Sequence, residues 1–354
     1  MSNYFKRFIL FEYIFGIALV ILILSFTIKK QLPEPLKINI PANFPTPVYD
    51  LSKNPITKEG FELGRKLFYD GILSRTGLVS CGSCHQASAA FIQADHDFSH
   101  GVEDQLGRRN SLPIFNALFK KSFFWDGGVP FLDFVPANPI ENPVEMDEKM
   151  DHVIQKLNQS ESYRALFKKA FDVDEIKTKE FLHALAQFMA AMISANAKYD
   201  KYVRKEGANL TQDEADGLKL FSTKCSSCHA TDMFTDGSYR NNGLSINYNS
   251  DKGREEVTLV AADRGKFKVP SLRNVEFTGP YMHDGRFETL EEVLEYYDSG
   301  VQESSTLDPL LKLDKQKPGI RLTKEEQKKI ILFLKTLTDY EFLKDSRFYE
   351  PTNH

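Results

Sequence analysis

All four cysteines of the 354-residue chain belong to one repeated pattern, Cys-x-x-Cys-His. The pattern occurs as Cys81, Cys84 and His85 in "CGSCH" and as Cys225, Cys228 and His229 in "CSSCH". Two thiols three residues apart on one helical turn can form thioethers with the two vinyl groups of one porphyrin, and the next histidine can ligate the iron. The repeated pattern therefore predicts two covalently bound c-type haems, with His85 and His229 as iron ligands.

Paired cysteines also occur in zinc sites, in redox-active Cys-x-x-Cys motifs and in disulfides. A four-cysteine zinc site leaves both histidines without a role, and a thioredoxin-like motif needs no second copy. Covalent haem of this type is attached on the exported side of a membrane. We therefore expect the folded body to lie in the periplasm or its equivalent.

An enzyme, unlike an electron carrier, needs acid–base groups beside an iron with an open coordination position. The region after the first motif offers His96, His100, Glu145 and the only tryptophan, Trp125. Glu145 stands between Val144 and Met146, whose apolar side chains would raise the pKa of its carboxyl. Composition alone leaves two alternatives open, because a tryptophan can belong to the core and a glutamate to the surface.

The elements around the two motifs are expected to be mainly α-helical. "TKEGFELGRKLF" (57–68) and "TQDEADGLKLF" (211–221) both begin with Thr, both reach G-x-K-L-F, and both lead into a cysteine pair. Their apolar residues recur at helical spacing, so we interpret them as one small helical module used twice. Helices are predicted over 57–70, 147–170, 177–203, 211–223, 288–298 and 323–338, and residues 241–264 are predicted to form a long polar loop.

The first thirty residues differ from the rest of the chain. Residues 8–28 form an apolar run with basic residues on both sides, long enough to cross a bilayer. No small-residue cleavage site is visible, which favours an uncleaved membrane anchor over a cleaved signal or a buried core helix. Residues 31–55 are rich in proline and predict an extended linker. The formal net charge of −4 gives no reason to expect nucleic acid as a partner.

Several further motifs occur in a fixed order: "SHG", "GRRN", "FWDG", "NPVEM" and "FKVPSLRNVEFTGPYMHDGRFETLEEV". Together with the two haem motifs, they make the chain resemble the bacterial dihaem cytochrome c peroxidases and their relative MauG, from about Asn54 to about Leu337. The resemblance implies two cytochrome c-like haem domains, a peroxidatic one over 56–205 and an electron-transfer one over 206–338. A tail, residues 339–354, would pack on the first domain.

The resemblance also implies roles for individual residues. The haem on His85 would be peroxidatic, His100 would ligate its iron in the resting form, and Glu145 would be the distal acid–base group. Trp125 would lie between the two haems. Three further residues match positions that bind calcium, namely Asn110, Thr278 and Pro280.

The second haem, on His229, would store an electron, and its far ligand is where this chain departs from the typical peroxidases. Those enzymes carry a Met on the helix after "HDG", whereas counting along this sequence places Tyr297 there, as in MauG. A phenolate is a hard, anionic ligand that stabilises ferric iron. Met282, in "YMHDG", is the alternative that its thioether alone would suggest.

The implied activity is reduction of hydrogen peroxide to water, with electrons from a small exported c-type cytochrome or copper protein. A MauG-like, peroxide-dependent oxidation of a partner protein is the first alternative, suggested by Tyr297. A membrane-tethered electron-transfer protein without catalysis is the second. A homodimer is compatible with each of these interpretations.

Overall fold

The computed structural model describes residues 32–314 and 316–352. The chain divides into two units, residues 1–34 and 35–354, and the second contains both Cys-x-x-Cys-His motifs. Within the described ranges, no helix has the length and apolarity that crossing a bilayer requires. The predicted membrane helix, residues 8–28, lies outside the described residues.

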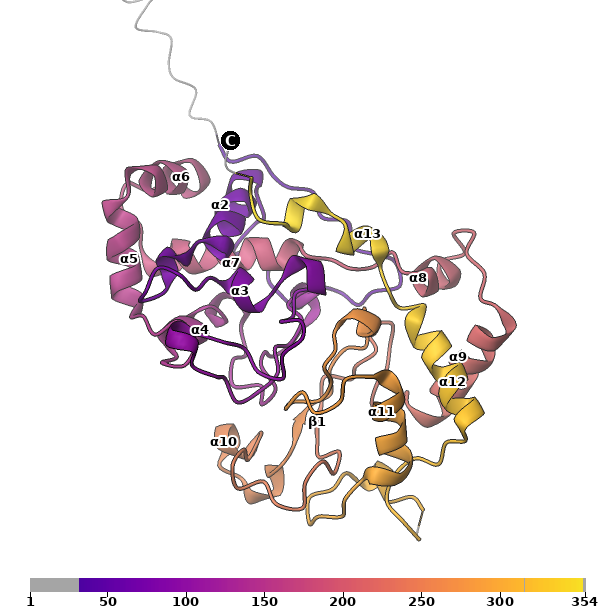
Figure 1. The fold of residues 1–354 in the computed structure, drawn as a ribbon. Helices are drawn as coiled ribbons and strands as arrows, with labels where there is room; N and C mark the ends of the chain where they lie inside the picture. The colour runs from indigo at the N-terminus through magenta and orange to yellow at the C-terminus, as the bar shows by residue number, and fades with distance from the viewer. Residues whose placement is uncertain (1–31, 315, 353–354) are drawn as a thin grey trace, which may run out of the picture. The chain divides into compact units, whose positions relative to one another are not determined.

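The first hydrophobic core is built by four helices and the loops between them (Figure 1). These helices are α2 (Lys58–Tyr69), α5 (Met150–Gln159), α6 (Glu161–Phe171) and α7 (Thr178–Ala191). Two short helices, α3 (Cys81–Cys84) and α4 (Ala137–Glu141), lie in the long connection between α2 and α5. The first Cys-x-x-Cys pair thus forms its own single helical turn.

The second hydrophobic core is built by α9 (Gln212–Lys224), α11 (Leu290–Glu295) and α12 (Lys324–Lys335). The remaining elements are α8 (Lys198–Val203), β1 (Tyr239–Arg240), α10 (Glu255–Thr258), β2 (Phe267–Lys268) and α13 (Tyr340–Leu343). The only sheet in the described residues is the antiparallel pair β1–β2. The prediction of a mainly helical chain is therefore confirmed, and α10 adds a short helix to the segment predicted as a polar loop.

The repeated G-x-K-L-F segment marks the same close helix crossing in both cores. A Cβ on Gly64 of α2 would lie 2.1 Å from the Ala184 carbonyl oxygen of α7. A Cβ on Gly217 of α9 would lie 2.0 Å from the Lys329 carbonyl oxygen of α12. Because only glycine permits this approach, the shared motif reflects a shared packing geometry.

Two of the predicted helices are interrupted. The expected helix over 147–170 divides at Ser160, whose side chain caps α6 by accepting a hydrogen bond from the Tyr163 backbone N–H. The expected helix over 177–203 divides between α7 and α8, because a carboxylate oxygen of Asp339 accepts hydrogen bonds from the backbone N–H groups of Ala195 and Asn196 at 2.7 and 2.8 Å. These tertiary bonds replace helical ones.

The C-terminal tail and the part of the proline-rich segment after residue 34 both contact the first core. Phe342 and Phe348 are buried in it, and the Tyr69 hydroxyl donates to the Phe348 carbonyl at 2.7 Å. The proline-rich segment, expected as an extended linker, also packs there: Phe44 is buried in the core, and the Leu36 N–H donates to the Ile56 carbonyl. The folded body therefore includes most of this segment.

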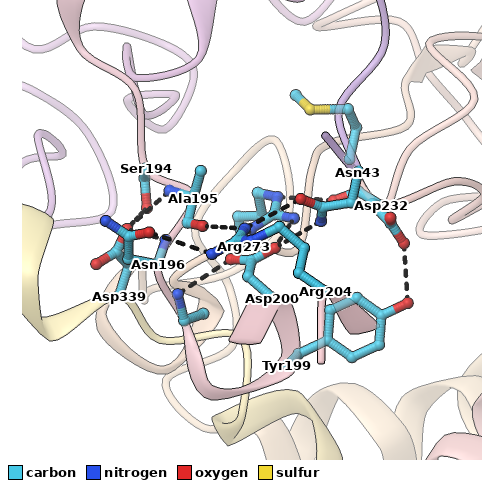
Figure 2. Close-up of polar contacts among 12 residues, drawn as sticks. Asn43, Ser194, Ala195, Asn196, Tyr199, Asp200, Arg204, Asp232, Arg273 and Asp339 are labelled. Carbon is cyan, nitrogen blue, oxygen red and sulfur yellow. Dashed lines mark hydrogen bonds and ion pairs between the residues drawn. The ribbon is translucent and has the colours of Figure 1, made fainter. Parts of the chain in front are cut away.

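A buried ion pair links the segment before α9 to the second half of the chain (Figure 2). Arg273 donates two hydrogen bonds to the Asp200 carboxylate, at 2.7 and 2.9 Å, and both side chains are fully buried. The Arg273 guanidinium also lies 4.3 Å from the centre of the Phe44 ring. One arginine thus ties together the proline-rich segment, α8 and the "PSLRN" segment.

Candidate haem sites and the residues around them

The first Cys-x-x-Cys-His motif is held in a short, capped turn. The His85 N–H donates to the Cys81 carbonyl at 2.9 Å, which places the imidazole directly after the two sulfurs. The His85 Nδ1 lies 2.9 Å from the Phe91 carbonyl oxygen. Donation from Nδ1 to this carbonyl leaves Nε2 with the lone pair that a metal ligand needs.

The second motif repeats this arrangement at the end of α9. The His229 N–H donates to the Cys225 carbonyl at 3.0 Å, and the His229 Nδ1 lies 3.1 Å from the Phe234 carbonyl oxygen. Burial lowers the pKa of both histidines, so each imidazole is neutral and suited to an iron at neutral pH. The two sites therefore share one ligand geometry.

The sulfurs in both motifs are free of disulfides. Burial raises the pKa of Cys81 and of Cys225 to about 12, so these thiols stay protonated at neutral pH. Unpaired thiols beside a histidine are those that a c-type haem attaches to.

A largely apolar cavity of about 220 Å³ adjoins the second motif. Cys228 and His229 border it on one side, and Leu272, Val275 and Leu294 are among the apolar residues around it. Two facing thiols, a neutral imidazole and an apolar wall are what a covalently attached porphyrin needs. The residues therefore fit a haem at this site.

Glu145 lies close to the first motif. After burial, the charge of its carboxylate is a further cause that raises the pKa of both Cys81 and Cys84, which requires proximity. Burial in turn raises the pKa of Glu145, and a hydrogen bond from the Asn142 amide to its Oε1, at 2.6 Å, lowers that pKa in part. A half-buried carboxyl with a raised pKa, held by one hydrogen bond, is suited to accepting and donating a proton.

The "SHG" loop packs directly on the Glu145 segment. A Cβ on Gly101 would lie 2.2 Å from the Val144 carbonyl oxygen, and the Val102 N–H donates to the Glu145 carbonyl at 2.7 Å. The glycine after His100 is therefore required by a close backbone approach. The His100 carbonyl lies 3.8 Å from the Cys84 sulfur, and its Nδ1 lies 2.5 Å from an Asp104 carboxylate oxygen. The structure thus places His100 beside the first motif, with its imidazole hydrogen-bonded to the Asp104 carboxylate.

Trp125 borders the cavity of the second motif and is held by its indole N–H, which donates to the Asn110 carbonyl at 2.8 Å. Its ring meets that of His283 edge-on, at 6.4 Å between centres. Asn110, Thr278 and Pro280 border the same cavity, although no cluster of three or more His, Cys, Asp or Glu side chains suited to a metal occurs in the described residues. Calcium binding through these three residues remains a prediction.

Both candidates for the far ligand of the second haem border its cavity. Tyr297 lies on a π-helical turn, Tyr296–Gly300, that continues α11, and burial raises the pKa of its hydroxyl to about 12. The Asn242 amide donates to the Met282 sulfur at 3.5 Å and also forms a hydrogen bond with Tyr297. Besides burial, Cys228 and Cys225 are near enough to influence the pKa of Tyr297, which places its hydroxyl near the second motif.

Two asparagines that form hydrogen bonds with the candidate site residues were not predicted from the sequence: Asn142, which contacts Glu145, and Asn242, which contacts Met282 and Tyr297. Asn142 opens "NPVEM", three residues before Glu145, a spacing typical of a side chain that folds back on a turn. Asn242 stands in a polar loop, and no local pattern connects it with Tyr297, 55 positions along the chain. Only the fold brings Asn242 to the second cavity.

The fold and the repeated site define a dihaem c-type cytochrome, and comparisons with known proteins identify the family. Residues 58–208 match the family model described as di-haem cytochrome c peroxidase. The chain is 33% identical over 293 residues to the methylamine utilization protein MauG of Methylorubrum extorquens, covering 80% of this chain and 79% of that protein. It is 35% identical over 281 residues to the cytochrome c551 peroxidase of Nitrosomonas europaea, covering 78% and 79%.

Solved structures agree with this assignment. A MauG-like protein associated with microbial copper homeostasis superposes with a TM-score of 0.81 at 29% identity, over 89% of this chain and 99% of that one. The dihaem peroxidase BthA of Burkholderia thailandensis has the same fold, with a TM-score of 0.71 at 20% identity, over 91% and 99%. The chain therefore belongs to the dihaem cytochrome c peroxidase/MauG family, whose members carry two haems.

Proposed function

We propose that this enzyme reduces hydrogen peroxide to water at the haem held by Cys81, Cys84 and His85. The observation that carries the proposal is Glu145, a carboxyl with a raised pKa beside that motif. When bound, haem supplies the iron that binds peroxide and the electrons for its reduction. Two electrons from a small exported c-type cytochrome or copper protein, and two protons, convert each peroxide to two waters.

The protein's own contribution is proton movement and positioning. Glu145, as a carboxylate, accepts a proton from the near oxygen of peroxide and donates it to the far oxygen, so that the far oxygen leaves as water. The Asn142 amide holds the carboxyl in place for both steps. His100 would be the residue that holds the iron of the first haem in the resting form, and its Nδ1 lies 2.5 Å from an Asp104 carboxylate oxygen, which orients the imidazole.

Two further roles follow from placement. Trp125, between Asn110 and His283, is proposed to relay electrons between the two haems. The family resemblance supports an oxygen-ligated calcium ion at Asn110, Thr278 and Pro280. Covalent haem supports a periplasmic location, with residues 8–28 as the proposed anchor.

The test uses the protein loaded with both haems, a reduced small c-type cytochrome and hydrogen peroxide. Peroxide-dependent oxidation of the cytochrome, with two cytochromes consumed per peroxide, is the expected result. A loaded protein that oxidises neither a cytochrome nor a copper protein under any condition of prior reduction or added calcium contradicts the proposal.

A second candidate function is peroxide-dependent oxidation of a partner protein. It is favoured by Tyr297 at the second cavity and by the similarity to MauG. Rapid mixing with peroxide and near-infrared detection of an oxidised state shared by both haems would support it. Fast oxidation of a small cytochrome without any such shared state would favour simple peroxide reduction.

Asn142→Ala is expected to move the acid limb of the kcat/KM profile to higher pH. Its amide lowers the pKa of Glu145, so its loss raises that pKa further, and the carboxylate needed for the first proton transfer becomes protonated at a higher pH. Asn138→Ala, an exposed asparagine of α4, is the matched control. An unchanged acid limb in Asn142→Ala would show that this amide does not tune the reacting carboxyl.

Tyr297→Phe is expected to change the electron paramagnetic resonance signal of the second haem, whereas Met282→Leu leaves it unchanged. The phenol oxygen is the proposed iron ligand, and phenylalanine removes only that oxygen. The opposite pattern, a change in Met282→Leu alone, would assign the sixth position to the thioether instead.

A further inference from the structure

Two lysines come together beside the haem sites. Lys268, on β2, borders the cavity of the second motif, and its Nζ donates to the Ser122 carbonyl. Lys120 lies two residues before Ser122, and its Nζ donates to the carbonyl of Pro113, a residue of the same cavity wall, at 2.9 Å. The loop at residues 120–122 thus carries the Lys120 ammonium group, and its Ser122 carbonyl accepts a hydrogen bond from the Lys268 ammonium group.

The two ammonium groups face different motifs but influence one another. The charge of Lys120 lowers the pKa of His85, which places Lys120 near the first motif. After burial, the charge of Lys120 is the largest cause that lowers the pKa of Lys268. Lys120 and Lys268 are therefore near enough to interact as like charges, and both are bonded to backbone carbonyls of the 113–122 segment, whose Pro113 borders the cavity of the second motif together with Lys268.

Within the described part of the chain, neither lysine has a carboxylate within ion-pair distance. Each is bonded to a backbone carbonyl. Asp126 is near enough to raise the pKa of Lys268, but its carboxylate already accepts from Arg109 at 2.5 Å. Arg254, stacked on the Tyr239 ring at 4.2 Å, adds a further positive charge that lowers the pKa of Lys268. The site therefore holds more positive charge than its own side chains neutralise.

Such an arrangement is costly without an anion. Burial lowers the pKa of Lys120 to about 8 and that of Lys268 to about 7, although both side chains are only half-buried in the protein alone. Removing like charges from water is unfavourable unless opposite charges replace the solvent. Each haem carries two propionate carboxylates, and these are its only anionic side groups.

We propose that Lys120 and Lys268 bind haem propionates, Lys120 those of the haem on His85 and Lys268 those of the haem on His229. The pair then neutralises the propionate edges of both cofactors. Positive charge beside a haem favours the reduced iron, so each lysine raises the reduction potential of its own haem. This inference requires the two haems, which the family shows, but it does not require the peroxidase reaction.

The test is a potentiometric titration of the loaded protein, in which visible absorption reports the redox state of each haem. Lys120→Met is expected to lower the reduction potential of the first haem, and Lys268→Met that of the second. The corresponding Lys→Arg variants keep the positive charge, so each reduction potential should stay close to the wild-type value. Lys121→Met, the exposed neighbouring lysine, is the control and is expected to leave both potentials unchanged. Wild-type potentials in both methionine variants would overturn the proposal.

The methionine variants could fail to load haem, and mass measurement of the intact protein would show this. In that case the crystal structure of the loaded wild-type protein decides the question. A propionate oxygen within about 4 Å of each Nζ is expected, the distance of an ion pair. Propionates that lie beyond this distance from both lysines overturn the proposal, whether or not the protein turns over peroxide.

Discussion

Glu145→Gln is expected to lower kcat for peroxide-dependent cytochrome oxidation by about 10²–10⁴-fold, the usual contribution of a positioned general acid–base group. Glutamine keeps the size of the side chain and can still accept the hydrogen bond from Asn142. It cannot accept the proton from the near oxygen of peroxide. Steady-state kinetics with a reduced cytochrome measure the effect.

Two controls make the result specific to this carboxyl. Glu141→Gln changes an exposed carboxylate on α4, four residues earlier, and should leave kcat near that of the wild type. The intact mass should show two haems in both variants. If Glu145→Gln and Glu141→Gln turn over equally fast with full haem content, the proton is moved by another group.

Arg273→Met is expected to lower the free energy of unfolding by about 3–5 kcal/mol, because removal of one member of a buried ion pair leaves the other charge without compensation. Asp200 would retain hydrogen bonds from Asn43 and from the Ala197 N–H, but it would lose its buried ion-pair partner (Figure 2). The variant also loses the stacking of the guanidinium on Phe44. Denaturant unfolding of the loaded protein measures the change.

Arg321→Met is the matched control. Arg321 pairs with Asp314 at 2.9 Å, but its side chain is 45% exposed, so its loss should cost only about 0–1 kcal/mol. Equal losses in the two variants would mean that burial of the Arg273–Asp200 pair adds nothing to the stability of this junction.

The local sequence was sufficient for the features that depend on neighbouring residues. Cys-x-x-Cys-His places two thiols and an imidazole on one turn wherever that turn occurs, and both copies have this geometry. The helical spacing in 57–68 and 211–221 predicted α2 and α9 to within one or two residues. The glycine that both segments share proved to be the point of close helix crossing.

The sequence also indicated Glu145 and His100, through motifs that a family resemblance connects to roles. The structure adds the packing of Gly101 on the backbone of residues 144–145, which explains why these two motifs lie together. Their chemical roles stay proposals, and the variants above test them.

Other features depended on contacts between distant parts of the chain, which no local pattern records. The break between α7 and α8 arises because Asp339, about 140 positions away, accepts hydrogen bonds from the backbone there. The proline-rich segment packs because Phe44 is buried in the first core and its ring contacts the Arg273 guanidinium. The interaction between the charges of Lys120 and Lys268 also depends on folding, because these residues are far apart in the sequence and only the fold brings them near one another. Spacing along the chain determines which groups can act within one turn, whereas burial and long-range pairing determine what charge those groups carry and which neighbours they have.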